Sequence, residues 1–221
     1  YCCKLINAGK ATDLLNATVQ KQIIEAIPTL GVKYVRFWDI YAPEMLLNIH
    51  EDRFHQNYGI LDSITDFLVK YKLKPYIELG FKPVLILKTT RNSIREIERK
   101  DTFDSETEMC SFYEGLILHF IDRYELEEVE SWYFEVWNEP DLPIFFHGKQ
   151  QDYFDLYAAT VQTVKNVNPA LRVGGPSTSA CRWVDDFKTY CEKNHVPYDF
   201  LTTHHYPGDG FGNSFGIKDA F

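Results

Sequence analysis

The residues with the clearest capacity for chemistry are Asn138 and Glu139. They close an aromatic stretch, residues 132–141, that reads Trp-Tyr-Phe-Glu-Val-Trp-Asn-Glu-Pro-Asp. Aromatic and β-branched residues predict a short buried strand, and Pro140 ends it because it lacks a backbone donor. Apolar neighbours disfavour the charged form of a carboxyl group, so Glu139 suits a general acid, with Asn138 able to hold a substrate hydroxyl beside it. The alternative is a strand-end carboxylate that caps the following helix.

A second polar group stands at the end of the last predicted strand. His204 and Tyr206 are two residues apart, so on a strand their side chains would share one face and point at one pocket. The alternative is that, of His204 and His205, one lies in the core and the other on the surface. No metal site is expected, because His50 and His55 fall in a predicted loop and no carboxylate has a fixed helical spacing to either.

Three further charged residues are predicted to support Glu139. Glu135 has the same strand parity as Glu139 and should face the interior, where an unpaired charge is costly, so Arg36 or another donor is expected to compensate it. Arg36 could instead orient a second carboxylate and keep it ionised. Glu78 is predicted to be a similar supporting group, with a nucleophile as the alternative.

Short apolar strands alternate with amphipathic helices along the chain. Helices are predicted where apolar residues recur at helical spacing, and strands where short apolar runs are bounded by Gly or Pro. The predicted strands cover residues 4–7, 32–37, 74–79, 132–137, 171–174 and 199–203. The predicted helices cover residues 18–30, 59–71, 105–124, 149–167 and 181–193, and residues 208–221 are a predicted glycine-rich loop.

Repeated strand–helix units without hairpin signals predict an α/β fold with a parallel sheet and helices outside it. An open doubly wound sheet and a (β/α)₈ TIM barrel both fit this pattern. No GxGxxG motif follows a predicted strand, which weighs against a nucleotide-binding open sheet. The candidate residues fall at strand C-terminal ends, where barrels build their sites. A barrel has eight strands and about 250 residues, so we expect residues 1–221 to form one partial catalytic barrel domain, with strands seven and eight beyond Phe221.

The composition is that of an ordinary globular protein, with 221 residues, 45% hydrophobic and 25% charged. A net charge of −9 would repel phosphates, so nucleic acid is not expected as a partner. No apolar run approaches the roughly 18 residues of a membrane span, and no signal peptide is recognisable. The five cysteines form no metal-binding pattern and favour a reducing, cytoplasmic location. Because the chain opens at Tyr1, its native N-terminus is expected upstream.

Several blocks of the chain resemble glycoside hydrolase family 39, the retaining β-xylosidase and α-L-iduronidase family, which is built on a (β/α)₈ barrel. The Trp-Asn-Glu-Pro element at residues 137–140 is shared by many related barrel glycosidases and indicates only the superfamily. Five further blocks in matching order extend the resemblance over nearly the whole chain: Ile6-Asn7-Ala8-Gly9-Lys10-Ala11, Tyr34-Val35-Arg36-Phe37, Lys74-Pro75-Tyr76-Ile77-Glu78-Leu79-Gly80-Phe81, Val173-Gly174-Gly175-Pro176 and Thr203-His204-His205-Tyr206-Pro207.

This resemblance implies roles for the candidate residues. Glu139 would be the general acid/base, and Asn138 would contact the sugar 2-hydroxyl with a hydrogen bond that can strengthen in the transition state. His204 and Tyr206 would also contact the sugar. The implied partner is a carbohydrate, a β-xyloside or xylo-oligosaccharide, and no cofactor is implied because positioned carboxylates suffice. Aromatic residues near strand ends could add sugar contacts, with loop anchoring as the alternative for the phenylalanines: Trp38, Phe81, Phe145 and Phe146.

Retaining hydrolysis needs a second carboxylate about 5–5.5 Å from the acid/base. The resemblance implies a Glu at the end of strand seven, beyond this chain, so we expect residues 1–221 alone to hydrolyse nothing. The chain also departs from the family, because Trp38 stands where many members have His, Asp141 stands where Asn is common, and residues 85–90 match poorly. A second hypothesis is therefore a weakly active or inactive sugar-sensing barrel of an AraC-type transcription regulator, in which similar barrels occur. A third is an interaction scaffold.

Overall fold

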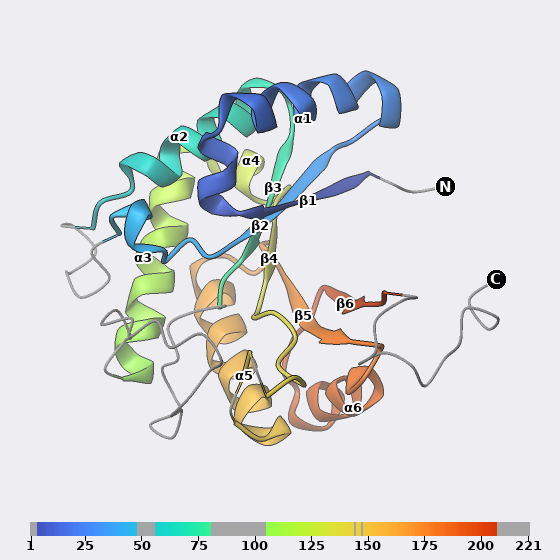
Figure 1. Cartoon of the computed structure of the whole chain (residues 1–221). Coiled ribbons are helices and arrows are strands. Elements are labelled where there is room, and N and C mark those ends of the chain that lie inside the picture. Colours follow the sequence, from blue (N-terminus) through green and yellow to red (C-terminus); the bar gives the residue numbers. More distant parts are fainter. Residues whose placement is uncertain (1–3, 48–55, 81–104, 144, 147, 207–221) are drawn as a thin grey trace.

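The protein, in a computed structural model, contains one parallel sheet (Figure 1), and the structure describes residues 4–47, 56–80, 105–143, 145–146 and 148–206. All neighbouring strand pairs in it are parallel. The strands are β1 Leu5–Lys10, β2 Tyr34–Trp38, β3 Lys74–Glu78, β4 Tyr133–Glu135, β5 Arg172–Ser179 and β6 Phe200–His204. Each overlaps one of the predicted strands, so the predicted strand count for this part of the chain is confirmed.

The strands pair in the same order in which they occur along the chain, from β1 to β6. A doubly wound sheet reverses its strand order at a switch point, so this order excludes that alternative. The sheet curls, with β1 and β6 at its two ends and the helices on its outer side (Figure 1). The fold is therefore an incomplete (β/α)₈ barrel, as the sequence predicts.

Helix ends follow local capping signals. Asn16 Oδ1 accepts the backbone N–H of Thr18 at 2.8 Å where helix α1, Ala17–Leu30, begins, and Gly31, with φ of 66°, ends the same helix. The four-residue helix α4, Leu126–Val129, was not predicted, because one turn is too short to show helical periodicity. The helices are η1 Ala11–Leu15, α1 Ala17–Leu30, η2 Pro43–Met45, α2 Gly59–Lys70, α3 Glu106–Tyr124, α4 Leu126–Val129, α5 Gln150–Val167 and α6 Val184–Asn194. None of the helices in the described ranges has the length and apolar character to cross a membrane.

Strand β1 runs to Lys10 rather than ending at residue 7, and the ends of β2, β3 and β6 differ from the prediction by one residue. The ends of β4 and β5, which lie beside Glu139, also differ from the prediction. Strand β4 stops at Glu135 rather than at residue 137, because Trp137 adopts a left-handed backbone with φ of 72° that turns the chain out of the sheet. Strand β5 runs to Ser179, five residues beyond the predicted end at Gly174. A Cβ on Gly174 would lie 2.4 Å from the Phe200 carbonyl oxygen, so this glycine permits close approach of β6 rather than ending the strand.

An apolar layer between the sheet and the helices holds the strand ends in place. Phe37, Ile77 and Phe134 from three neighbouring strands are completely buried, as are Leu116 of α3 and Val161 of α5. Burial of such side chains contributes about 1.5–3 kcal/mol each. The polar residues that follow these strands are therefore carried on a packed scaffold.

Candidate functional site

A buried ion pair joins β2 to β4 beneath the candidate site. The Arg36 Nε donates to Glu135 Oε2 at 2.7 Å, and Arg36 Nη2 lies 2.6 Å from the same oxygen. The Tyr76 hydroxyl on β3 donates to Glu135 Oε1 at 3.0 Å. Both carboxylate oxygens of Glu135 are thus satisfied, and the predicted partnership with Arg36 is confirmed.

The charges of this cluster reinforce one another. Burial alone would lower the pKa of Arg36, but the carboxylates of Glu135 and Glu78 outweigh it and raise that pKa. Burial, and then the Glu135 charge, raise the pKa of Tyr76 well above its ordinary value. Tyr76 therefore stays a hydroxyl donor, and Arg36 stays a cation.

Asn138 is oriented by the same arginine. Arg36 Nη2 donates to Asn138 Oδ1 at 3.0 Å, a second use of the guanidinium fork. Because the amide oxygen is occupied in this way, the Nδ2 group of Asn138 is turned to act as the donor. That is the polarity needed to bind the oxygen of a hydroxyl group.

Glu139 lies just outside the sheet and turns its carboxylate towards β6. Its backbone N–H donates to the Ser177 carbonyl at 2.8 Å, and its φ of 48° is left-handed. Oε1 lies 3.0 Å from His204 Nδ1, with 13% of the Glu139 side chain exposed. The N-terminus of the following helix, α5, is capped instead by Asp152, whose Oδ2 accepts the Lys149 N–H at 2.6 Å. The helix-capping alternative for Glu139 is therefore wrong.

His204 bridges Glu139 to β5. Its Nε2 lies 3.2 Å from the hydroxyl of Ser177, which is completely buried. Ser177 is not among the predicted site residues, because the sequence predicts that this strand ends at Gly174. A run of hydroxyl residues, Ser177, Thr178 and Ser179, follows Gly174-Gly175-Pro176, but the sequence does not show which of them contacts His204.

A third carboxylate fastens the loop that follows Glu139. Asp141 Oδ1 accepts the backbone N–H of Ser179 at 2.8 Å, and Oδ2 accepts the Ser179 hydroxyl at 2.5 Å. The side chain of Asp141 is fully buried, and Arg182 lies 3.8 Å away. The loop carrying Glu139 is thus tied to the end of β5 on both sides of the acid.

The remaining candidates are less tightly gathered. Glu78 is completely buried and its Oε1 accepts the Gly80 N–H at 3.1 Å, which fits a supporting group. Trp38 is half-buried at the end of β2, with Lys10 Nζ 5.7 Å from its ring centroid.

Tyr206 lies beyond the end of β6 and is 58% exposed, so the expectation that it shares a strand face with His204 is wrong. Phe145 is half-buried in the loop after β4.

Other candidates fall outside the described residues or fail to assemble. Phe81, His50, His55 and residues 85–90 lie outside the described residues. Within the ranges that the structure describes, no three His, Cys, Asp or Glu side chains gather as a metal site would require.

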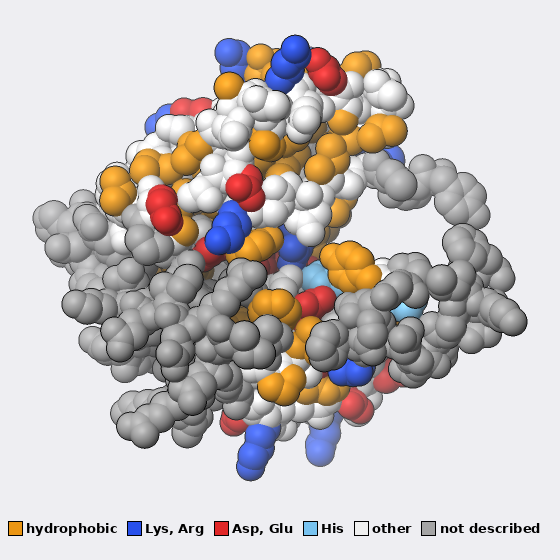
Figure 2. Space-filling model, in the orientation of Figure 1, with side chains coloured by type: hydrophobic (Ala, Val, Ile, Leu, Met, Phe, Trp, Pro, Cys, Tyr) orange, Lys and Arg blue, Asp and Glu red, His pale blue; other side chains and the backbone are white. Residues whose placement is uncertain are grey.

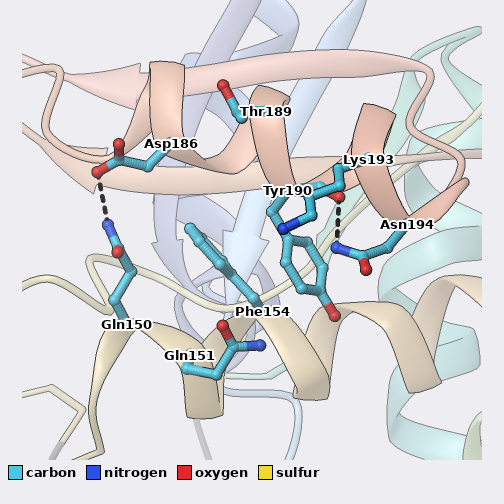
Figure 3. A pocket seen from close by; sticks show the side chains of 8 residues that line it. All are labelled: Gln150, Gln151, Phe154, Asp186, Thr189, Tyr190, Lys193 and Asn194. Carbon is cyan, nitrogen blue, oxygen red and sulfur yellow. Dashed lines mark hydrogen bonds between the residues drawn. The ribbon is translucent and has the colours of Figure 1, made fainter.

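The surface is hollowed at two places that the figures show. Acidic, basic and histidine side chains gather in the hollow at the middle of the face in Figure 2. A separate hollow of about 370 Å³ lies outside the barrel between α5 and α6 (Figure 3), where Gln150 Nε2 donates to Asp186 Oδ2 at 2.9 Å. It contains none of the predicted site residues. It is lined by Gln150, Gln151, Phe154, Asp186, Thr189, Tyr190, Lys193 and Asn194.

Comparison with known proteins places this geometry in a family. The sequence profile of glycosyl hydrolases family 39 matches residues 2–220. The chain is 35% identical over 224 residues to a β-xylosidase from Caldicellulosiruptor saccharolyticus, covering 100% of this chain and 46% of that protein. It is 29% identical over 164 residues to an α-L-iduronidase from Homo sapiens, covering 71% of this chain and 23% of that protein.

Solved structures agree with the sequence comparison. A monomeric β-xylosidase from Caulobacter crescentus CB15 has a TM-score of 0.77 and 30% sequence identity, covering 93% of this chain and 42% of that one. The chain spans less than half the length of each of these relatives. Because the family profile matches nearly every residue, the chain belongs to glycosyl hydrolases family 39.

Proposed function

We propose that this chain carries the acid/base half of a retaining glycosidase that acts on β-linked pentosides, with β-xylosides as its substrate class. The observation that carries the proposal is the Glu139 carboxylate, partly exposed after β4 with one oxygen 3.0 Å from His204. Its second oxygen, Oε2, has no hydrogen-bond partner within the described part of the chain. Glu139 thus has a free position at which to hold and transfer a proton.

The proposed reaction uses that position twice. Protonated Glu139 donates its proton to the glycosidic oxygen while the bond from C1 to that oxygen breaks and a second carboxylate attacks C1. The Glu139 carboxylate then takes a proton from the water that displaces the enzyme carboxylate at C1. The Nδ2 group of Asn138, with its oxygen held by Arg36, donates to the sugar 2-hydroxyl. His204 orients the acid, and Trp38, Tyr206, Phe81 and Phe145 are proposed sugar contacts.

We assign the second carboxylate to a seventh strand that follows this partial catalytic domain, residues 1–221. Glu135 is poorly suited to attack C1, because Arg36 and Tyr76 occupy both of its oxygens. Glu78 is completely buried on β3. The similarity to β-xylosidases supports the choice of substrate, since this chain is 35% identical over 224 residues to the Caldicellulosiruptor protein.

The test is Glu139→Gln in the complete protein. We expect kcat/KM for an unactivated xyloside such as xylobiose to fall about 10²–10⁴-fold, the usual contribution of a general acid. An aryl xyloside with a good leaving group should lose far less in its first step, because that leaving group departs without protonation. Glu192→Gln on α6, whose side chain is 60% exposed, is the matched control and should leave both rates unchanged.

Two outcomes would contradict the proposal. A Glu139→Gln protein with the wild-type rate on xylobiose would remove Glu139 from the reaction. A wild-type protein that binds xylobiose without releasing xylose would indicate a sugar-sensing barrel instead of a hydrolase.

A further inference from the structure

Ser177 contacts both members of the Glu139–His204 pair. Its carbonyl accepts the Glu139 N–H at 2.8 Å, and its hydroxyl oxygen lies 3.2 Å from His204 Nε2. The residue is completely buried, and its φ of 54° is left-handed. A serine in such a position is held by its surroundings on every side, so its hydroxyl has little freedom to point elsewhere.

The burial of this hydroxyl determines where one hydrogen must go. A serine hydroxyl carries a single hydrogen, and buried donors are almost always paired. Among the described residues, His204 Nε2 is the acceptor within reach of Ser177 Oγ. A nitrogen that accepts this hydrogen carries none of its own, so a neutral imidazole must carry its hydrogen on Nδ1.

The same hydrogen then reaches the acid. The Nδ1 atom faces Glu139 Oε1 at 3.0 Å. With the hydrogen on Nδ1, this nitrogen donates to that oxygen. With the opposite tautomer, Nδ1 would accept, and a protonated Glu139 would direct its proton at the histidine instead of at the substrate. The tautomer of His204 therefore decides which oxygen of Glu139 is available for proton transfer.

We propose that Ser177 is a positioning residue that holds His204 as its Nδ1–H tautomer and so reserves Oε2 of Glu139 for the transferred proton. The catalytic part of this inference rests on the proposed function, whereas the placement of the hydrogens does not. Ser177 acts through His204 and contacts no substrate.

The first test needs no turnover. Nitrogen-15 NMR of the histidine rings in the complete wild-type protein distinguishes protonated from unprotonated ring nitrogens, and loss of signals in His204→Gln assigns the ring. We expect His204 to be protonated at Nδ1 and unprotonated at Nε2. A ring protonated mainly at Nε2 would overturn the proposal, and this measurement stands even if every Ser177 variant fails to fold.

The second test removes the hydroxyl. In Ser177→Ala we expect a mixture of tautomers and a fall of about 10-fold in kcat/KM for xylobiose, the worth of one lost hydrogen bond. The activated aryl xyloside should change less than about 2-fold, since its leaving group needs no acid. Thr178→Val is the matched control, because Thr178 donates its hydroxyl to the Arg182 carbonyl and does not contact His204, and it should change neither quantity.

The outcomes separate the two proposals. Equal losses on both substrates, or an unchanged tautomer in Ser177→Ala, would mean that Ser177 is merely structural. If the protein hydrolyses no xyloside but His204 is found as the Nδ1–H tautomer, the proposed function fails and the assignment of the hydrogens holds.

Discussion

Two glutamates four residues apart on the same segment have opposite surroundings. Glu135 is 1% exposed on β4, and its two oxygens accept from Arg36 and Tyr76. Glu139 follows the strand, retains 13% of its side-chain exposure, and uses one oxygen for His204. Both oxygens of the first carboxylate already accept hydrogen bonds, whereas one oxygen of the second has no hydrogen-bond partner in the described part of the chain. The number of hydrogen bonds that each carboxylate already accepts, rather than residue type, separates Glu135 from Glu139, the proposed acid.

The backbone explains how neighbours in sequence come to differ so much. Strand parity would place Glu135 and Glu139 on one face, but β4 ends at Glu135, so parity does not extend to Glu139. Trp137 and Glu139 both have positive φ, at 72° and 48°. Such conformations cost about 1–3 kcal/mol each and persist where the surroundings hold them. Glu139 therefore takes its position where the chain leaves the sheet, with its backbone N–H held by the Ser177 carbonyl.

The largest expected effect is a difference in stability between the two glutamates. Glu135→Gln leaves the Arg36 charge buried without its counter-ion and should cost about 3–5 kcal/mol. Glu139→Gln keeps a hydrogen bond to His204 within reach and should cost about 1 kcal/mol or less. Urea unfolding followed by tryptophan fluorescence measures both. Equal losses of unfolding free energy in Glu135→Gln and Glu139→Gln would contradict this difference between the two carboxylates.

Arg36→Lys tests whether the guanidinium fork is required. A lysine supplies one compact ammonium group and cannot bond Glu135 and Asn138 together, so we expect a loss of about 1.5–3 kcal/mol. The control is Arg123→Lys, where an exposed arginine pairs with Asp66 at 2.5 Å on the surface. Exposed pairs contribute about 1 kcal/mol at most, so this control should lose less. A control that loses as much as Arg36→Lys would contradict the special status of the buried cluster.

Much of this comparison was predictable from the sequence. Apolar periodicity indicated the strands and helices, and the cost of a buried charge indicated that Glu135 needs a donor such as Arg36. The position of Ser177 on β5, in contact with His204, was not predictable, because Gly174-Gly175-Pro176 has the composition of a turn. In the fold the glycine pair serves close packing instead: a Cβ on Gly175 would lie 2.7 Å from the Tyr153 hydroxyl oxygen. Local composition cannot reveal such a long-range contact.

The role of Tyr76 in the buried cluster predicts an alkaline dependence of stability. Burial and Glu135 raise the pKa of Tyr76 above its ordinary value of about 10. Its contribution is therefore fully present below about pH 10 and is lost as pH rises from there towards the folded-state pKa, by up to about 1.4 kcal/mol per pH unit. Tyr76→Phe should lower the free energy of unfolding by about 1 kcal/mol at pH 7, and the stability of this variant should fall less steeply above pH 10 than that of the wild type. Parallel curves of unfolding free energy against pH for the wild type and Tyr76→Phe would contradict this.

Asn138 accepts a hydrogen bond from Arg36 and directly precedes Glu139, so it links the buried cluster of Arg36, Glu135 and Tyr76 to the proposed acid, and its removal should have a small effect on stability. Asn138→Ala should cost only about 0.5–1.5 kcal/mol, because Arg36 keeps both of its contacts to Glu135. Its kinetic effect should depend on the substrate: the preference for a xyloside over its 2-deoxy analogue should largely disappear, since the amide that binds the 2-hydroxyl is gone.

A double-substitution cycle sharpens this last point. If Arg36 acts on the substrate by orienting Asn138, Arg36→Lys should reduce the discrimination between xyloside and 2-deoxyxyloside. The Arg36→Lys/Asn138→Ala protein should then discriminate no less than Asn138→Ala alone. Independent, additive losses would instead mean that Arg36 supports Glu135 alone. The buried cluster would then contribute stability without directing the chemistry beside it, because Asn138 is the link between them in this structure.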